Sequence, residues 1–336
     1  MTARTGHSSA VPQVAGIGCG QRGAHLVRHF YQLGALAMVC DMNEAARESA
    51  LRIAPGVPVA SHLNEVTTGA VVIATPAATH YDIARQALET GRDVMVEKPL
   101  ALTFAQGARL VQLAREQRRI LMVGHMLEYH PAITRLMEMV QHGELGKIHY
   151  VYANRLNPWI ERLDDNILWS FAAHDIAIML RLLGGLPLQV ATSGGDYVPP
   201  KVVDVTMTNM LFDQGVRAHT YVSWLHPYRE QRLVVVGSAK MASFDELTNE
   251  LMLYDQPEAP RAETAATLGQ RVPFDPVEPR RVECEAFLRA IATRETPLTN
   301  GESEWRVMRV LQAAQRSLVT NGEPVPLLGE NAKVEG

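Results

Sequence analysis

Short apolar runs alternate with amphipathic stretches along the first third of the chain. The runs are VAGI, LAMVC, AVVIAT, DVMVE and ILMVGHM, and VPVA adds a shorter one. Such runs are typical of parallel strands covered on both faces, while the stretches between them show the spacing of amphipathic helices. Because strand and helix alternate from residue 14 to about 126, the pattern predicts a doubly wound parallel sheet of the α/β class.

The pattern changes from about residue 127. A helical stretch, a strand at 148–156 and a helix at 174–185 precede a series of strands with few helices between them. The strand candidates are LQVATSGGDYV, DVTMTNMLF, VRAHTYVSWL, QRLVVVG, MASFDE and ELMLYD. Short connections, such as the hairpin turn expected at 213–215, make this second sheet mainly antiparallel. With closing helices at about 280–293 and 302–319, the pattern predicts a C-terminal α+β domain around a large open sheet.

The chain of 336 residues is long enough for two domains. We expect a flexible tail at 1–12, a first domain at 13–126 and a second domain at 127–336. The tail is polar and lacks the apolar core of a signal peptide. Residues 256–279 are rich in Pro, Ala and Glu, so we expect them to form a crossing over the surface.

Composition describes an ordinary soluble globular protein, with 47% apolar and 20% charged residues. The formal net charge of −4 gives no overall attraction to nucleic acid or to an anionic membrane, so local Arg or Lys must meet any anionic substrate. No run approaches the roughly 18–20 apolar residues of a membrane span. Cys19, Cys40 and Cys284 form no C-x-x-C pair, so we expect them to serve in packing. The cytoplasm is then the default compartment.

Three glycines follow the first apolar run with G-x-G-x-x-G spacing. Gly18 permits a tight strand-to-helix turn, Gly20 lets a pyrophosphate approach the backbone, and Gly23 permits close packing of helix on strand. The helix N-terminus favours an anion there. Such spacing also occurs by chance in turns, but here strand, glycines, helix, second strand and acid arrive in order. The stretch predicts dinucleotide binding, and the intervening residues of the predicted cofactor loop are Cys19, Gln21 and Arg22.

Asp41 ends the second apolar run, close to the spacing of roughly 20 residues expected for the acid that binds the adenosine ribose. Its charge would repel a 2′-phosphate. Met42 and Asn43, the next residues, supply no cation to reverse this repulsion. The sequence therefore favours NAD over NADP.

Ligands of a doubly wound sheet bind beyond the carboxyl ends of its strands. Further cofactor-binding candidates at that edge are Thr75, Pro76, His80, Glu97, Lys98 and His125. His80 and His125 have no third metal ligand nearby in sequence, and H-E-x-x-H and similar sets are absent. We therefore expect no metal site.

Several motifs together resemble the Gfo/Idh/MocA oxidoreductases throughout the chain. They are GIGCGQRG, TPAATHYDIARQAL, GRDVMVEKPLALT and VGHMLEYHPA, followed by a His-bearing helix before an open sheet. The E-K-P tripeptide is the most specific of these elements. The resemblance implies a Rossmann domain for NAD at 13–126 and, at 127–336, a domain for substrate binding and oligomerisation. It also implies a sugar or polyol substrate and a homodimer or homotetramer formed through the second sheet.

Two later stretches, NILWSFAAHDIAIMLRLLGG and VSWLHPYREQRLVVVGSAKMASFDE, look like the branch of the family that acts on nucleotide-linked amino sugars. They particularly resemble UDP-N-acetylglucosamine 3-dehydrogenases, which supply the 3-keto sugar for a 3-amino sugar of lipid A. This resemblance implies oxidation at C3 of a UDP-sugar, with a downstream aminotransferase as functional partner.

The family resemblance points to two catalytic residues. The E-K-P turn places Lys98 where its ammonium could stabilise developing alkoxide charge. His174 opens the helix that the family turns toward the substrate, and it could accept and return a proton near neutrality. Many relatives carry an acid four residues earlier, where this chain has Ser170. Asp175 follows His174 directly, but neighbouring side chains on a helix diverge, so we leave it out of the catalytic set.

Arginines are the natural receptors for the two phosphates of a UDP-sugar, because their guanidinium groups bind phosphate in bidentate fashion. Arg155 is the first candidate, followed by Arg229 and Arg232. Trp159 could flank the sugar, and Trp169 could flank the nicotinamide.

Three alternatives remain open. A free polyol or aldose would leave Arg155 without an anionic partner, and a UDP-sugar uronate would need a further site for its carboxylate. The chain could also be a nicotinamide-binding regulator without catalysis. Retention of both Lys98 and His174 argues against that reading.

Overall fold

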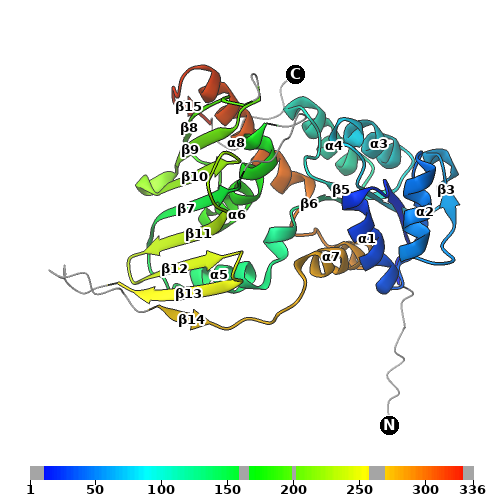
Figure 1. Ribbon diagram of the computed structural model, residues 1–336, viewed down its shortest axis with the longest axis horizontal. Helices are drawn as coiled ribbons and strands as arrows, with labels where there is room; N and C mark the ends of the chain where they lie inside the picture. The colour runs from blue at the N-terminus through cyan, green and yellow to red at the C-terminus, as the bar shows by residue number, and fades with distance from the viewer. Residues whose placement is uncertain (1–10, 159–165, 199–201, 257–268, 328–336) are drawn as a thin grey trace, which may run out of the picture. The chain divides into compact units, whose positions relative to one another are not determined.

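The computed structural model describes residues 11–158, 166–198, 202–256 and 269–327 (Figure 1). The chain divides into two compact units. The first consists of Met1–Met126 with Glu278–Glu304, and the second of Leu127–Val277 with Trp305–Gly336. One domain was expected over 127–336, whereas Glu278–Glu304 belongs to the first unit.

The first unit contains a six-stranded sheet in the order β3-β2-β1-β4-β5-β6, and every pair of neighbours is parallel. In this spatial order the strands are Val59–Ala60, Leu36–Cys40, Val14–Ile17, Ala70–Ile73, Asp93–Glu97 and Leu121–Gly124. The helices that alternate with them are α1 (Gln21–Gln32), α2 (Glu44–Ile53), α3 (Ala77–Glu89) and α4 (Phe104–Glu116). Strands β1, β4, β5 and β6 are buried along their whole length, which explains their continuous apolar runs. The order in which strands are added to the sheet reverses between β1 and β4, and sheets of this kind bind ligands at such a point.

The returning segment packs on the first unit through α7 (Pro279–Thr293). The rings of Phe30 on α1 and Phe287 on α7 meet edge to face, with centroids 6.4 Å apart. Arg294 then pairs with Asp93 at 2.6 Å, and the Val123 amide donates to the Thr299 carbonyl at 2.8 Å. These contacts join residues far apart in sequence, which is why local patterning did not reveal them.

The second unit contains a nine-stranded sheet in the order β14-β13-β12-β11-β7-β10-β9-β8-β15. In this order the strands are Gln270–Val272, Glu250–Asp255, Lys240–Asp245, Glu230–Gly237, Ile148–Leu156, Arg217–Ser223, Val205–Leu211, Gln189–Gly195 and Val325–Pro326. Among the described strands of this sheet, only β7 and β10 pair in parallel, so the expected open, mainly antiparallel sheet is confirmed. The expected hairpin at 213–215 joins β9 to β10, with positive φ angles at Gln214 and Gly215. Strand β14 lies within 256–279, the segment expected to cross the surface. Residues 257–268 of that segment are outside the described residues.

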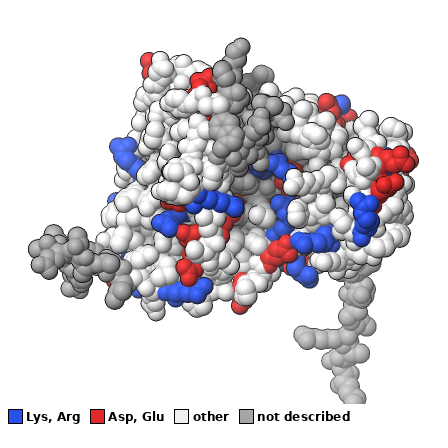
Figure 2. Space-filling view, in the orientation of Figure 1, with Lys and Arg blue, Asp and Glu red and all other residues white. Residues whose placement is uncertain are grey.

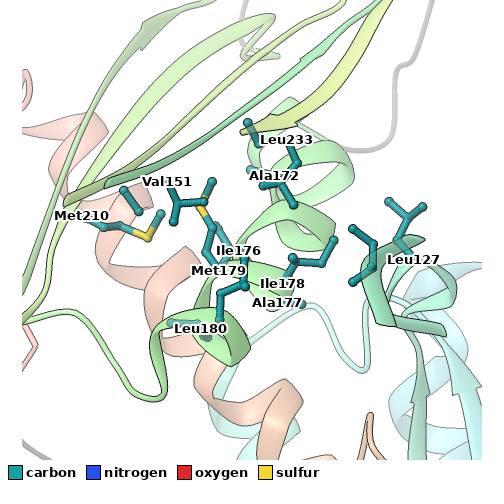
Figure 3. Close-up of a cluster of buried hydrophobic side chains, with 14 of the residues drawn as sticks. Leu127, Val151, Ala172, Ile176, Ala177, Ile178, Met179, Leu180, Met210 and Leu233 are labelled. Carbon is teal, nitrogen blue, oxygen red and sulfur yellow. The ribbon is translucent and has the colours of Figure 1, made fainter. Parts of the chain in front are cut away.

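Helices pack on the buried face of this second sheet. They are α5 (Pro131–Gln141), α6 (Ala173–Leu183) and α8 (Gly301–Val319). Figure 3 shows Ile176 and Met179 of α6 against Val151 and Met210 of the sheet, and all four side chains are at most 1% exposed. Burial of each such side chain stabilises the fold by about 1.5–3 kcal/mol. This core fixes α6, the helix that carries His174.

Charges of both signs are interspersed on the face of the molecule shown in Figure 2. A charged ligand approaching that face would meet individual side chains and not a field of one sign. Across the described ranges, no helix has the length and apolar character needed to cross a membrane.

Candidate functional site

The glycine turn between β1 and α1 excludes a side chain at two of its three glycines and leaves open space at the third. Gly18 has a φ of +87°, and a Cβ there would lie 2.7 Å from the Thr75 amide nitrogen. A Cβ on Gly23 would lie 1.9 Å from the Gly18 carbonyl oxygen. At Gly20, the N-cap of α1, a Cβ would meet no described atom within 4 Å. The turn therefore offers open space beside a helix N-terminus, and these residues fit a dinucleotide pyrophosphate.

The carboxylate of Asp41 is tied to this turn. Its Oδ2 accepts a hydrogen bond from the Cys19 amide at 2.7 Å, and its Oδ1 accepts one from the Asn43 amide at 2.8 Å. The residue is half-buried. The acid expected to bind the ribose is therefore held directly beside the glycines expected to hold the pyrophosphate.

The two cysteines of this region are buried and form no disulfide. Burial, with a smaller contribution from Asp41, raises the pKa of the Cys19 thiol to about 12. Burial also raises the pKa of Cys40 to about 11, with Glu65 adding to the effect. Both thiols stay protonated near neutral pH, which fits the packing role expected for them.

The E-K-P turn follows β5 and is held by His80. Lys98 is 9% exposed, and His80 is 1% exposed. The Nδ1 atom of His80 lies 2.7 Å from the Pro99 carbonyl oxygen, and its Nε2 lies 2.8 Å from the Thr75 carbonyl oxygen. The ring thus links the turn after β4 to the turn that carries Lys98. This position gives His80 a supporting role, and direct contact of His80, Thr75 or Pro76 with the cofactor stays a prediction.

Glu97 is engaged by the returning segment. Its Oε1 accepts a hydrogen bond from Nη1 of Arg280 at 2.6 Å. The same nitrogen lies 3.9 Å from the fully buried carboxyl group of Glu283. Burial, and next the charge of Glu97, raises the pKa of Glu283 to about 8. One guanidinium therefore lies beside two carboxyl groups, of which Glu97 is hydrogen-bonded to it and Glu283 has the raised pKa.

His125 is engaged by the same segment. Its Nε2 lies 2.5 Å from Oε2 of Glu304, and both side chains are 2% exposed. His125 and Glu97 thus both pair with residues of 127–336, which were expected to belong to the other domain. Their contact with the cofactor stays a prediction.

In the second unit, His174 follows a π turn. Leu168–Ala172 form a π-helix that runs into α6, so His174 is the second residue of α6 and not the opening of an isolated helix. His174 is half-exposed between the buried residues Ala173 and Asp175. Single π turns within helices occur frequently at functional sites. The structure thus presents His174 at an irregular helix start, and its catalytic role stays a prediction.

Trp169 and Ser170 lie in the π turn itself. Trp169 is partly buried and packs against the core, and its amide donates to Asn166 Oδ1 at 3.1 Å. Ser170 is 4% exposed. Trp159 lies outside the described residues. Contact of Trp169 with nicotinamide stays a prediction.

Arg155 differs from its expected role as a phosphate receptor. It donates to Asp175 from Nε at 3.2 Å and from Nη2 at 2.9 Å, and to Glu246 from Nη1 at 3.0 Å. Its side chain is only 10% exposed. Burial acts to lower the pKa of Arg155, but the two carboxylates outweigh it and raise that pKa. The charge is already compensated within the protein, so this geometry argues for an anchor of α6 and against a phosphate contact.

The other arginine candidates lie near β11. Arg229 is exposed, and its Nη2 lies 3.4 Å from Gln231 Oε1. Arg232 pairs with Asp245 at 2.8 Å. Substrate binding by Arg229 stays a prediction.

Sequence reasoning missed Arg47 of α2. Its Nη1 donates to the carbonyl oxygens of Asp41 at 2.8 Å and Met42 at 3.0 Å. Its place in the first turns of the helix after Asp41 could have signalled this contact. Within the described ranges, no group of three or more His, Cys, Asp or Glu residues could hold a metal ion.

Comparison with protein families gives two matches. Residues 13–125 match the oxidoreductase family with an NAD-binding Rossmann fold, GFO_IDH_MocA. Residues 133–243 match the C-terminal domain of the same family. The two matches together span more than half of the chain.

Individual relatives agree with the family matches. The chain is 29% identical to UDP-N-acetylglucosamine 3-dehydrogenase of Acidithiobacillus ferrooxidans, over 87% of this chain and 92% of the relative. It is 30% identical to D-xylose 1-dehydrogenase (NADP(+)) 2 of Haloferax volcanii, over 82% of this chain and 88% of the relative. A solved structure of the Acidithiobacillus enzyme superposes with a TM-score of 0.83 at 26% identity, covering 92% of this chain and 97% of that one. The chain therefore belongs to the Gfo/Idh/MocA family and is an NAD-dependent oxidoreductase.

Proposed function

We propose that this enzyme oxidises the C3 hydroxyl of a nucleotide-linked amino sugar, UDP-N-acetylglucosamine, to the 3-keto sugar with NAD as acceptor. The observation that carries this proposal is similarity along nearly the whole chain to a relative named for that reaction. At the coarser level, the enzyme is an NAD-dependent sugar dehydrogenase. The 3-keto product suits an aminotransferase that would install a 3-amino group, as in lipid A synthesis.

The first unit would hold the cofactor. The turn at Gly18, Gly20 and Gly23 would receive the pyrophosphate at the N-terminus of α1. The Asp41 carboxylate, positioned by the Cys19 amide, would accept hydrogen bonds from the adenosine ribose. When bound, NAD supplies the nicotinamide that takes up the hydride.

Two side chains would carry the proton chemistry. The hydride leaves from C3, so the proton of the C3 hydroxyl must go to a base, and His174 takes it. The Lys98 ammonium donates a hydrogen bond to the same oxygen and stabilises the negative charge that develops there. Lys98 is supported by the His80 link below the E-K-P turn, and His174 by the Arg155–Asp175 pair at the start of α6.

We also propose a homodimer or homotetramer that forms through the second sheet. The face of this sheet away from its helices carries aromatic side chains in contact with one another. The rings of Tyr152 and His219 stack with their centroids 5.2 Å apart, and the ring centroids of Tyr150 and Tyr152 are 6.4 Å apart. Tyr150 is 41% exposed and Met207 is 49% exposed. Such a surface gains free energy when a second copy covers it.

A free sugar or polyol is the second candidate substrate. The engagement of Arg155 by two carboxylates favours it, because the phosphate receptor expected from the sequence is already occupied within the protein. A UDP-sugar uronate stays an alternative for the same class of reaction.

The test is isotope transfer from a defined carbon. The enzyme is incubated with NAD and UDP-N-acetylglucosamine deuterated at C3, and the reduced cofactor is analysed by mass spectrometry. Deuterium in NADH supports the proposal, while turnover without deuterium transfer refutes the C3 assignment. A parallel panel of free sugars and UDP-uronates measures NADH production at 340 nm, and faster oxidation of a free sugar would favour the second candidate.

A further inference from the structure

Arg47 is fixed at the loop that presents Asp41. Its Nη1 donates hydrogen bonds to the carbonyl oxygens of Asp41 and Met42, at 2.8 and 3.0 Å. This loop links β2 to α2, and Asn43 caps α2 by accepting from the Ala46 amide at 3.2 Å. The guanidinium is therefore held against the backbone of the residue whose carboxylate faces the glycine turn.

The remaining donors of Arg47 are uncommitted. Across the described residues, both hydrogen bonds of Arg47 come from Nη1, so its Nε and Nη2 donate to no protein acceptor, and it forms no ion pair with a described carboxylate. The residue is half-buried, which fixes its position more firmly than that of a fully exposed arginine. A guanidinium edge with two parallel N–H donors matches two oxygens of a phosphate group.

The negative charge of Asp41 keeps a 2′-phosphate away from the guanidinium of Arg47. Both carboxylate oxygens are held by backbone amides, at 2.7 Å from Cys19 and 2.8 Å from Asn43. A phosphate on the ribose 2′ oxygen would approach this carboxylate and be repelled. Removal of the Asp41 charge would leave the positive charge of Arg47 at the same loop.

We propose that Arg47 is a second determinant of dinucleotide selectivity, which steadies the Asp41 loop for NAD and becomes the receptor for the 2′-phosphate of NADP when the Asp41 carboxylate is removed. The inference rests on the proposed contact of Asp41 with the ribose. It concerns the cofactor alone, so it does not depend on which sugar is oxidised.

The test measures dinucleotide binding by calorimetry, without any sugar. The variants are Asp41→Ser, Arg47→Ala and the two combined. Asp41→Asn is a second charge-removing variant that keeps an oxygen to accept from the Cys19 amide. Arg52→Ala is the matched control, because Arg52 lies on the same helix with the same charge but bonds to Ser49 Oγ at 2.5 Å. Circular dichroism checks that each variant is folded.

We expect Asp41→Ser and Asp41→Asn to bind NAD more weakly and NADP at least about tenfold more tightly than the parent. Adding Arg47→Ala should remove at least about tenfold of the gained NADP affinity, as loss of a charge-assisted bond to phosphate would. The same addition of Arg47→Ala should change NAD affinity by about threefold or less. Adding Arg52→Ala to Asp41→Ser should leave both affinities within about twofold.

Equal NADP binding with and without Arg47 in the Asp41→Ser background would overturn the inference. An equal loss of NAD and NADP affinity when Arg47→Ala is added to Asp41→Ser would also overturn it, because Arg47 would then only stabilise the loop. If Asp41→Ser leaves NAD binding unchanged, the proposed contact of Asp41 with the ribose fails, and the inference fails with it. Failure of sugar oxidation with intact NAD binding would instead contradict only the proposed substrate.

Discussion

Replacement of Arg155 by alanine should destabilise the second unit and leave the affinity of the folded enzyme for its substrate unchanged. Arg155 makes three hydrogen bonds to Asp175 and Glu246, and the Asp175 side chain is 4% exposed. The substitution leaves the Asp175 carboxylate buried without its cation. Breaking a buried pair in this way costs about 3–5 kcal/mol, a large part of the roughly 5–15 kcal/mol that stabilises a typical protein.

The measurement is urea unfolding followed by tryptophan fluorescence. All four tryptophans belong to the second unit, so the signal reports the unit that contains Arg155. The control is Arg232→Ala, which breaks a pair with Asp245 in the same sheet. The Arg232 side chain is 46% exposed, so its loss should cost no more than about 1 kcal/mol.

The destabilisation should also depend on pH. Burial raises the pKa of Asp175, and Arg155 opposes that rise. Without the Arg155 charge, the pKa of Asp175 in the folded state lies still further above its pKa in the unfolded state. A raised carboxyl pKa means that stability is lost as pH rises. The variant should therefore be closer to the parent in stability at pH 5 than at pH 8.

One result would refute this reasoning. If Arg155→Ala keeps the parental unfolding midpoint but binds a UDP-sugar at least about tenfold more weakly, Arg155 is the phosphate receptor expected from the sequence. Arg155→Lys separates the two roles further. It keeps the charge but loses the bidentate geometry toward Asp175, so we expect a smaller loss of stability than with alanine.

Further predictions concern the catalytic pair, a buried acid and the glycine turn. Lys98→Ala and His174→Ala should each lower kcat by about 100-fold or more without weakening NAD binding, and their combined effect should be less than the product of the two, as double-mutant kinetics would show. Relative to the parent, Glu283→Gln should gain stability as pH rises from about 5 to 8. The reason is that the pKa of Glu283 is raised to about 8, so the parent's carboxyl group loses its stabilising contribution over that range. Urea unfolding at several pH values measures this difference, and the same pH dependence for both proteins would contradict the prediction. Gly23→Ala should abolish NAD binding measured by calorimetry, because its Cβ would lie 1.9 Å from the Gly18 carbonyl oxygen.

Sequence patterning predicted the elements whose cause is local. The buried strands β1, β4 and β5 appear as apolar runs because helices cover both faces of the sheet. Gly18 and Gly23 were predictable because the backbone geometry of the turn excludes a Cβ at both positions. The π turn at Leu168–Ala172 was not predictable, because one extra residue in a helical turn barely changes the apolar pattern.

The roles of charged residues were harder to predict, since their partners lie far away in sequence. An arginine in a strand has the same local pattern whether it faces a phosphate or a buried carboxylate. For Arg155, the deciding contacts are with Asp175 on a later helix and Glu246 after a later strand. For Glu97, the partner is Arg280, far along the chain in a segment that the apolar pattern assigned to the other domain.

The returning segment gives the E-K-P motif a structural dependence that the motif does not show by itself. Glu97 precedes Lys98 directly, and its carboxylate is held by Arg280 of the segment Glu278–Glu304. On the other side of Lys98, the Pro99 carbonyl is held by His80. The residues on both sides of Lys98 are thus fixed by side chains from outside the turn. The tripeptide identifies the family, but the position of Lys98 depends on residues that the tripeptide does not contain.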